Sequence, residues 1–237
     1  MTDTILDVRE IDVFYASSHI LFDVSFTARK GRTLALLGRN GAGKSTTMKA
    51  IMGVVPVRSG TICLGGAEIQ SCTPHRVAQM GVGLVPEDRQ VFPGHTVEDN
   101  LRIAMKPGSE GQTEWHMDNI LSAFPLLERL MDRKAGMLSG GEQQLLAMAR
   151  CLMGNPDVIL LDEPSEGLAP IIVQQIDRLI RELRQTGITI ILAEQNMHFC
   201  LGISDDAVVI DKGRIVYSDT IEALRKDEDV LSRYLAV

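Results

Sequence analysis

The feature that most constrains the fold of this chain is a glycine-rich segment near its start, residues 38–45 (GRNGAGKS). It fits the pattern G-x-x-x-x-G-K-[ST], follows an apolar run at residues 33–37 that is typical of a buried strand, and precedes a helical pattern. Glycines allow backbone N–H groups to turn inward around phosphate oxygens, and the positive end of the following helix favours the same anion. The segment therefore predicts a nucleoside triphosphate site, and the flanking elements disfavour an ordinary glycine-rich turn.

The side chains of this segment have expected tasks at the phosphates. Lys44 is predicted to reach the β and γ phosphates of ATP and to take part in catalysis, and Ser45 is predicted to offer its hydroxyl to Mg²⁺. The residues of this segment that we expect to bind ATP are Gly38, Asn40, Gly41, Ala42, Gly43, Lys44, Ser45 and the adjoining Thr46.

Two carboxylates follow an apolar run at residues 158–161. The carboxyl end of a parallel strand lies where phosphate-bound metal is held, so Asp162 is predicted to bind Mg²⁺ directly or through water. Glu163 can then face the γ phosphate and polarise a water molecule as general base, a role worth roughly 10²–10⁴ in rate. Surface acids at a strand end are the alternative, which the presence of Lys44 disfavours.

The spacing of apolar residues indicates an α/β fold. Unbroken apolar runs suit strands of a parallel sheet that helices cover on both faces. They occupy residues 34–37, 83–85, 158–161, 188–193 and 207–210. A helix is expected to begin near Pro170 and to stop at Gly187. Alternation at residues 5–13 and 21–28, with a turn at 65–66, predicts an antiparallel β layer beside the main sheet.

Residues 1–237 are expected to form a single ATPase domain without internal repeats. We expect residues 1–88 and 155–237 to form a P-loop NTPase (RecA-like) core together with the β layer. Residues 89–154 are expected to form an inserted α-helical subdomain, because the pattern there becomes helical, with turn signals at Pro107 and Pro125.

Charge and composition disfavour several classes of function. The formal net charge is −7, which argues against broad binding to nucleic acid or to an anionic membrane surface. The four cysteines show no C-x-x-C spacing, which favours reduced thiols over disulfides. No apolar run approaches the ~20 residues of a membrane span, and the first ten residues lack the pattern of a signal peptide. We therefore expect a soluble chain that is not exported.

Residues 138–144 (LSGGEQQ) narrow the family. They resemble the signature sequence of ABC ATPases, and the resemblance covers essentially the whole chain. Ser139 and Glu142 also fit a capping box, and a capped helix N-terminus is itself an anion site. The resemblance implies that Ser139, Gly140, Gly141 and Glu142 contact ATP held by a second ATPase subunit, identical or paralogous, in a head-to-tail dimer with two ATP molecules at its interface.

Three further segments resemble the ATPases of importers for branched-chain amino acids and related amides, including urea: residues 85–92 (VPEDRQVF), 163–170 (EPSEGLAP) and 193–196 (AEQN). The resemblance implies a peripheral subunit on the cytoplasmic side of the cell membrane that hydrolyses ATP with Mg²⁺. Its implied partners are integral membrane permease subunits and, indirectly, a periplasmic or extracellular solute-binding protein, with no nucleic acid. Residues 87–93 resemble the loop that contacts the permease, with Phe92 as its apolar anchor or, alternatively, as a core residue.

Some positions depart from the general ABC pattern. Glu87 stands where most relatives carry a glutamine that senses Mg²⁺, and its carboxylate is predicted to bind metal or water. Gln195 stands where a switch histidine is common and is predicted to donate a hydrogen bond to the γ phosphate, with His198 as the competing candidate. Residues 165–168 (SEGL) lack the usual aspartate after the catalytic glutamate. The subgroup tolerates these departures, so we expect an active enzyme.

The resemblance also implies that Tyr15 stacks on adenine, with Phe14 as the alternative residue; plain packing is the competing explanation. Three other functions stay open: an importer ATPase for another small organic solute, a soluble ABC ATPase serving DNA repair or ribosomes, and a regulatory subunit without turnover. The acidic charge and the lack of a second ATPase unit disfavour the second, and Glu163 disfavours the third.

Overall fold

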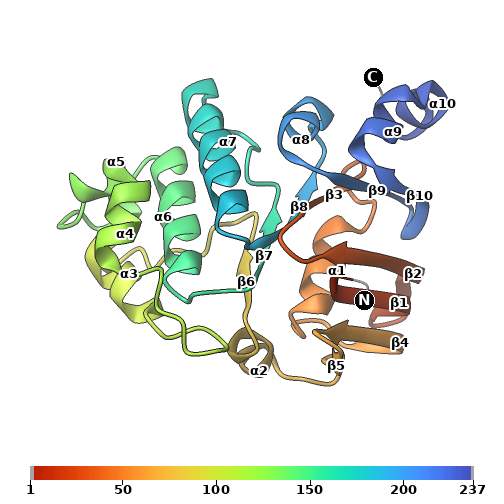
Figure 1. Ribbon diagram of the computed structural model, residues 1–237, viewed down its shortest axis with the longest axis horizontal. Helices are drawn as coiled ribbons and strands as arrows, with labels where there is room; N and C mark the ends of the chain where they lie inside the picture. The colour runs from red at the N-terminus through yellow and green to blue at the C-terminus, as the bar shows by residue number, and fades with distance from the viewer. Residues whose placement is uncertain (1–2, 236–237) are drawn as a thin grey trace.

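The main sheet of the computed structural model, which describes residues 3–235, has six strands in the order β10-β9-β3-β8-β7-β6. Its strands are β3 (Thr33–Leu37), β6 (Val82–Val85), β7 (Val158–Asp162), β8 (Thr189–Glu194), β9 (Asp206–Asp211) and β10 (Arg214–Thr220). All neighbours pair in parallel except β10, which runs antiparallel to β9. The expected parallel sheet is therefore confirmed, and Figure 1 shows it crossing the middle of the molecule.

A second, four-stranded sheet in the order β2-β1-β4-β5 lies beside the first. Its antiparallel strands are β1 (Thr4–Tyr15), β2 (Ser18–Arg29), β4 (Val57–Leu64) and β5 (Ala67–Glu68). The turn between β4 and β5 requires positive φ at Gly65 and Gly66, 55° and 86°, which glycine adopts without steric cost. The antiparallel layer and its turn are thus confirmed.

Ten α-helices have bounds in the described part of the chain. They are α1 (Lys44–Ile51), α2 (Pro74–Gln79), α3 (Val97–Ala104), α4 (Met117–Ala123), α5 (Pro125–Glu128), α6 (Gly140–Leu152), α7 (Pro170–Gln185), α8 (Met197–Ile203), α9 (Ile221–Lys226) and α10 (Glu228–Val230). Within residues 3–235, no helix is both long enough and apolar enough to cross a membrane.

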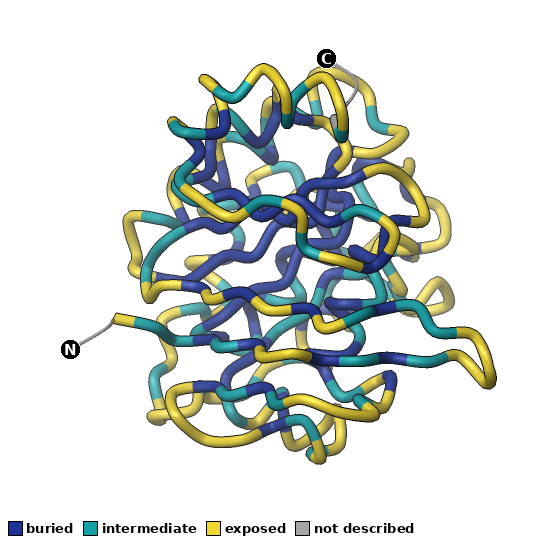
Figure 2. Tube along the Cα trace, turned by 90° about the vertical axis from the view of Figure 1, so that its right-hand side faces the viewer, coloured by how far each residue is buried: buried dark blue, intermediate teal, exposed yellow. Residues whose placement is uncertain are grey.

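All five residues of β3 are buried, because both faces of this strand are covered. Leu34 and Leu36 pack with α1 and the antiparallel layer, whereas Ala35 and Leu37 pack with α6 and α7 on the other face. Successive side chains of a strand point to opposite faces, so a strand covered on both sides needs an unbroken apolar run. Figure 2 shows these buried strands as dark tubes through the centre of the molecule.

Helices α3 to α6 lie between β6 and β7 in the sequence and gather on the left of the molecule in Figure 1. Helix α7 begins at Pro170 and ends shortly before Gly187, whose φ of 84° is the left-handed conformation that stops a helix. Its buried face, Ile176, Leu179 and Leu183, has the helical spacing expected of it. We retain residues 89–154 as a proposed helical subdomain.

Candidate functional site

The loop between β3 and α1 is shaped by glycines that could not be replaced. Gly41 and Gly43 have φ of 80° and 118°, in the left-handed region. A Cβ atom on Gly43 would lie 2.7 Å from the Leu21 side chain, and one on Gly38 would lie 2.4 Å from the Ile210 carbonyl oxygen. Conformation therefore requires glycine at positions 41 and 43, and packing requires it at positions 38 and 43.

Lys44, the first residue of α1, is buried with its charge paired. Its Nζ lies 2.9 Å from an Oε1 of Glu163 and donates to the carbonyl oxygens of Gly38 and Arg39 at 2.8 and 3.2 Å. Burial acts to raise the pKa of Glu163, but hydrogen bonds with Glu166 and Lys44, together with the Lys44 charge, lower it overall. Glu163 is therefore an ionised carboxylate next to the phosphate loop.

The residues expected to hold Mg²⁺ meet at the end of β7. Ser45 Oγ donates to Asp162 Oδ1 at 3.0 Å. Burial, together with the charges of Glu163 and Glu87, raises the pKa of Asp162 to about 6, against the opposing effect of the Ser45 hydrogen bond. A hydroxyl and a carboxylate at this spacing fit Mg²⁺, which takes few protein ligands and completes its shell with phosphate oxygens and water. Residues 3–235 contain no group of three or more His, Cys, Asp or Glu that could hold a metal ion on its own.

A cavity of about 470 Å³ opens over this loop. Its lining residues are Tyr15, Ile20, Asn40, Gly41, Gly43, Lys44, Ser45, Thr46, Glu87, Glu163 and Glu166. Tyr15 is 44% exposed, so its ring is available for stacking. Gly38 and Ala42 are buried and do not line the cavity; the Gly38 carbonyl oxygen accepts from Lys44 Nζ.

Glu166 also lines this cavity, although nothing in the sequence indicates a role for it. Its backbone N–H donates to the Glu163 carbonyl oxygen at 3.2 Å. The hydrogen bond and charge of Glu163 raise the pKa of Glu166 to about 7, with further contributions from burial and from Glu87 and Glu194. The only signal in the sequence was an acid three positions after Glu163, which does not by itself reveal that both side chains face one cavity.

Gln195 is not among the residues that line the cavity. It is exposed in the turn between β8 and α8, and His198 is exposed in the first turn of α8. The buried residue at that edge is Glu194, whose carboxylate accepts from the backbone N–H of Ser165 at 3.1 Å and of Asn196 at 3.3 Å. The contact of Gln195 with the γ phosphate therefore stays a prediction.

The first turn of α6 carries the expected capping box. Ser139 Oγ accepts from Glu142 N at 3.3 Å, and Glu142 Oε2 accepts from Ser139 N at 2.7 Å. Position 141 has no room for a side chain, because a Cβ atom there would lie 2.7 Å from the Ile172 side chain of α7. Neither these residues nor Gly140 line the cavity over the phosphate loop, so the role of this capped helix end as an anion site stays a prediction.

The segment at residues 87–93 is tied to α6 and α3. Arg150 Nη2 donates to the Gln90 carbonyl oxygen at 2.7 Å, and its guanidinium lies 5.0 Å from the centre of the Phe92 ring. Asn100 of α3 accepts from Phe92 N at 2.9 Å. Phe92 itself is 43% exposed, so the structure does not support a core position for it.

Comparison with known proteins assigns the family. Residues 21–166 match the sequence model described as ABC transporter. The chain belongs to the ATP-binding family of ABC transporters. As an ABC ATPase it hydrolyses ATP and works with membrane components of a transporter, and the fold expected from the sequence is confirmed.

Three relatives show how far the similarity of this ABC ATPase extends. The high-affinity branched-chain amino acid transport ATP-binding protein BraG of Pseudomonas aeruginosa is 40% identical over 97% of this chain and 99% of its own. The lipopolysaccharide export system ATP-binding protein LptB of Escherichia coli is 33% identical over 97% and 96%. A crystal structure of a nucleotide-free ATP-binding cassette from an ABC transporter superposes with a TM-score of 0.85, at 28% identity over 99% of both chains.

Proposed function

We propose that this ABC ATPase powers the uptake of amino acids, chiefly branched-chain ones or related small amides. The observation that carries the proposal is the end-to-end similarity to an ATPase named for branched-chain amino acid transport, at higher identity than to the lipopolysaccharide export ATPase. The segments at residues 85–92, 163–170 and 193–196 support it, because they resemble the same importer group. Uptake of another small organic solute is the alternative.

At the phosphate loop, ATP binding exchanges one partner of Lys44 for another. The Nζ that now contacts Glu163 at 2.9 Å is the cation nearest to the positions of the β and γ phosphates, so we infer that it turns to them when ATP binds. Glu163 then loses its counter-ion and becomes free to accept a proton from the attacking water. Phosphoryl transfer depends mostly on positioning and charge stabilisation, and the loop, Lys44 and Glu163 supply both.

Mg²⁺ would be held by Ser45 and Asp162, with Glu87 close enough to raise the pKa of Asp162 through its charge. When bound, the ion neutralises charge on the β and γ phosphates. Its presence would offset the cost of burying the ionised Asp162 carboxylate.

The separate anion site at Ser139 to Glu142 supports a head-to-tail dimer. Within one chain this helix end does not line the ATP cavity, so ATP could contact it only when a second subunit holds that ATP. Two such contacts in a symmetric pair would close two ATP molecules into the interface. Hydrolysis would thereby depend on closure of the dimer, which couples the chemistry to movement.

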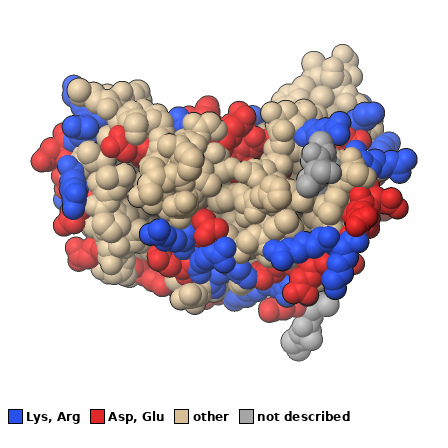
Figure 3. Space-filling model, turned by 90° about the horizontal axis from the view of Figure 1, so that it is seen from above, with Lys and Arg blue, Asp and Glu red and all other residues tan. Residues whose placement is uncertain are grey.

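The segment at residues 87–93 is the proposed contact with the permease. The Asn100 side chain bonds to the backbone N–H and carbonyl oxygen of Phe92, whose ring is exposed, and the exposed apolar residues Ile103 and Met105 follow at the end of α3. A transporter subunit with such a contact would sit at the cytoplasmic face of the membrane, and a solute-binding protein would act on the opposite side. On the face shown in Figure 3, basic side chains lie beside acidic ones along the rim, an arrangement that does not favour a nucleic acid partner.

The test is uptake by the transporter assembled from this chain and its membrane subunits. Proteoliposomes with internal MgATP and an external solute-binding protein should accumulate labelled leucine, and Glu163→Gln should abolish accumulation. Transport of a different solute, or outward movement of lipid, with leucine ignored would refute the assignment.

A further inference from the structure

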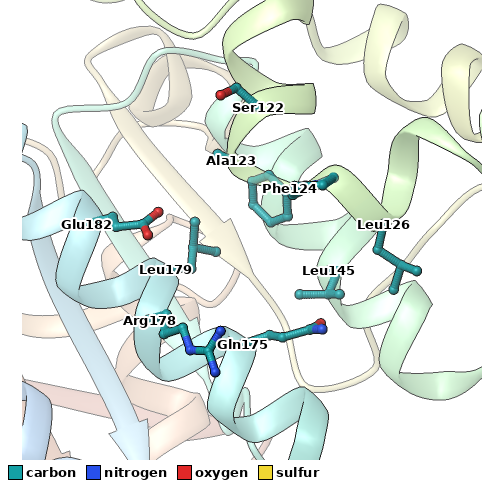
Figure 4. A pocket seen from close by; sticks show the side chains of 10 residues that line it. Ser122, Ala123, Phe124, Leu126, Leu145, Gln175, Arg178, Leu179 and Glu182 are labelled. Carbon is teal, nitrogen blue, oxygen red and sulfur yellow. The ribbon is translucent and has the colours of Figure 1, made fainter.

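A second cavity lies between two parts of the chain, away from the phosphate loop (Figure 4). Its volume is about 350 Å³, near the lower end of the range of small-molecule sites. Helix α7 forms one wall; α6 and residues 122–126, where α4 passes into α5, form the other. None of its lining residues belongs to the ATP cavity.

The inner surface of this cavity is apolar. Phe124, Leu145 and Leu179 come from three different segments and turn toward the same space in Figure 4. All three belong to one buried core cluster, and Leu126 packs against it. The cavity therefore offers a small ligand an apolar surface that is already ordered by the core.

The rim of the cavity carries two opposite charges without a partner. Arg178 and Glu182 stand one turn apart on α7, and within residues 3–235 neither forms an ion pair within 4 Å or a side-chain hydrogen bond. Arg181 of the same helix, by contrast, pairs with Asp177 at 2.8 Å. An arginine four residues before a glutamate is the less favourable order for such a helical pair. Both charges are thus free to meet a ligand.

We propose that this cavity binds a free α-amino acid with an apolar side chain. Arg178 would pair with the carboxylate, Glu182 with the ammonium group, and Phe124, Leu145 and Leu179 would cover the side chain. A zwitterion with one apolar arm matches an apolar cavity flanked by one positive and one negative charge. A ligand that lacks either charge leaves one rim residue unpaired.

The position of the cavity makes it regulatory. Leu145 belongs to α6, whose first turn carries the capped anion site, and Leu179 belongs to α7, which begins seven residues after Glu163. A ligand that contacts both helices fixes the distance between them and resists the closure that hydrolysis requires. The imported amino acid would accumulate on the ATPase side and slow its own uptake. This feedback rests on the proposed function; the binding itself does not.

Isothermal titration of the full chain tests the binding. L-leucine should bind, whereas leucinamide, which lacks the carboxylate, and 4-methylpentanoate, which lacks the ammonium group, should each bind about tenfold more weakly. Arg178→Gln should remove the preference over leucinamide and Glu182→Gln the preference over 4-methylpentanoate. Arg181→Gln is the matched control and should bind leucine as the wild type does.

No binding of leucine, equal binding of all three compounds, or leucine binding unchanged in both Arg178→Gln and Glu182→Gln would overturn the site. In the assembled transporter, leucine on the ATPase side should lower the rate of ATP hydrolysis several-fold, and in Arg178→Gln it should not. Leucine on the opposite side tests the proposed function instead. Loss of uptake with leucine binding retained would refute that function and leave the cavity, whereas normal uptake without inhibition from the ATPase side would refute the regulatory role.

Discussion

At the scale of single residues, Lys44 and Glu163 form an ion pair that is almost completely buried. The Lys44 and Glu163 side chains are 3% and 7% exposed and contact each other at 2.9 Å. A buried pair of this kind contributes little net stability, but removing one partner leaves an uncompensated buried charge. Replacing one of the two residues should therefore destabilise the fold more than replacing both.

We predict that Lys44→Ala lowers the free energy of unfolding by about 3 kcal/mol in the absence of nucleotide, because Glu163 is left buried and unpaired. The double variant Lys44→Ala/Glu163→Gln should recover part of that loss. Urea titration measures both. Arg102→Ala, which breaks the exposed pair with Glu98, is the control and should cost only about 0.5 kcal/mol. Equal losses in the single and double variants would show that the buried charge is not the cause.

Asp162 gives a prediction about pH. Its pKa is raised from 3.8 to about 6, so the folded chain favours the neutral acid. The stability that this preference contributes is present below pH 4 and is lost as pH rises through about 6. Asp162→Asn does not titrate. Between pH 4.5 and 8, without metal or nucleotide, the variant should therefore gain about 2 kcal/mol relative to the wild type in urea unfolding. Parallel pH profiles would contradict the buried, neutral acid.

Helices and strands could be predicted where the local sequence itself requires them. The apolar run of β3 follows from burial on two faces, and Pro170 and Ser139 mark helix starts by their own chemistry. Contacts between distant elements left no such signal. Examples are the contacts of Arg150 with Gln90 and Phe92, and the position of Glu166 in the ATP cavity. Both depend on the tertiary packing of segments that are far apart in the sequence.

At the loop before α3, Phe92→Ala should leave ATP binding intact and reduce solute-stimulated ATP hydrolysis in the assembled transporter several-fold. The reason is that the variant removes the exposed apolar ring while the Asn100 and Arg150 bonds to the backbone remain. Val216→Ala, an exposed apolar residue of β10, should change neither property. Unaltered stimulation in Phe92→Ala would mean that the permease contacts a different surface.

At the scale of the whole molecule, the two proposed anion sites do not share a cavity. One is the loop that begins α1, and the other is the capped start of α6. A parallel main sheet could be expected from the apolar runs, but the order of its strands and the separation of these two sites only appear once the chain is folded. The proposed dimer follows from that separation, since each chain would supply the half that its partner lacks.

The most direct test of the account is phosphate release from MgATP by the wild type and Glu163→Gln at equal concentration, with nucleotide binding and sizing chromatography in parallel. The account predicts that the wild type releases phosphate. Glu163→Gln should bind ATP, elute as an ATP-dependent dimer and release phosphate at least roughly 10²-fold more slowly, because its amide cannot accept the proton of the attacking water. Equal rates of release, with only monomer in the presence of ATP, would contradict both the catalytic role of Glu163 and the closed pair of sites.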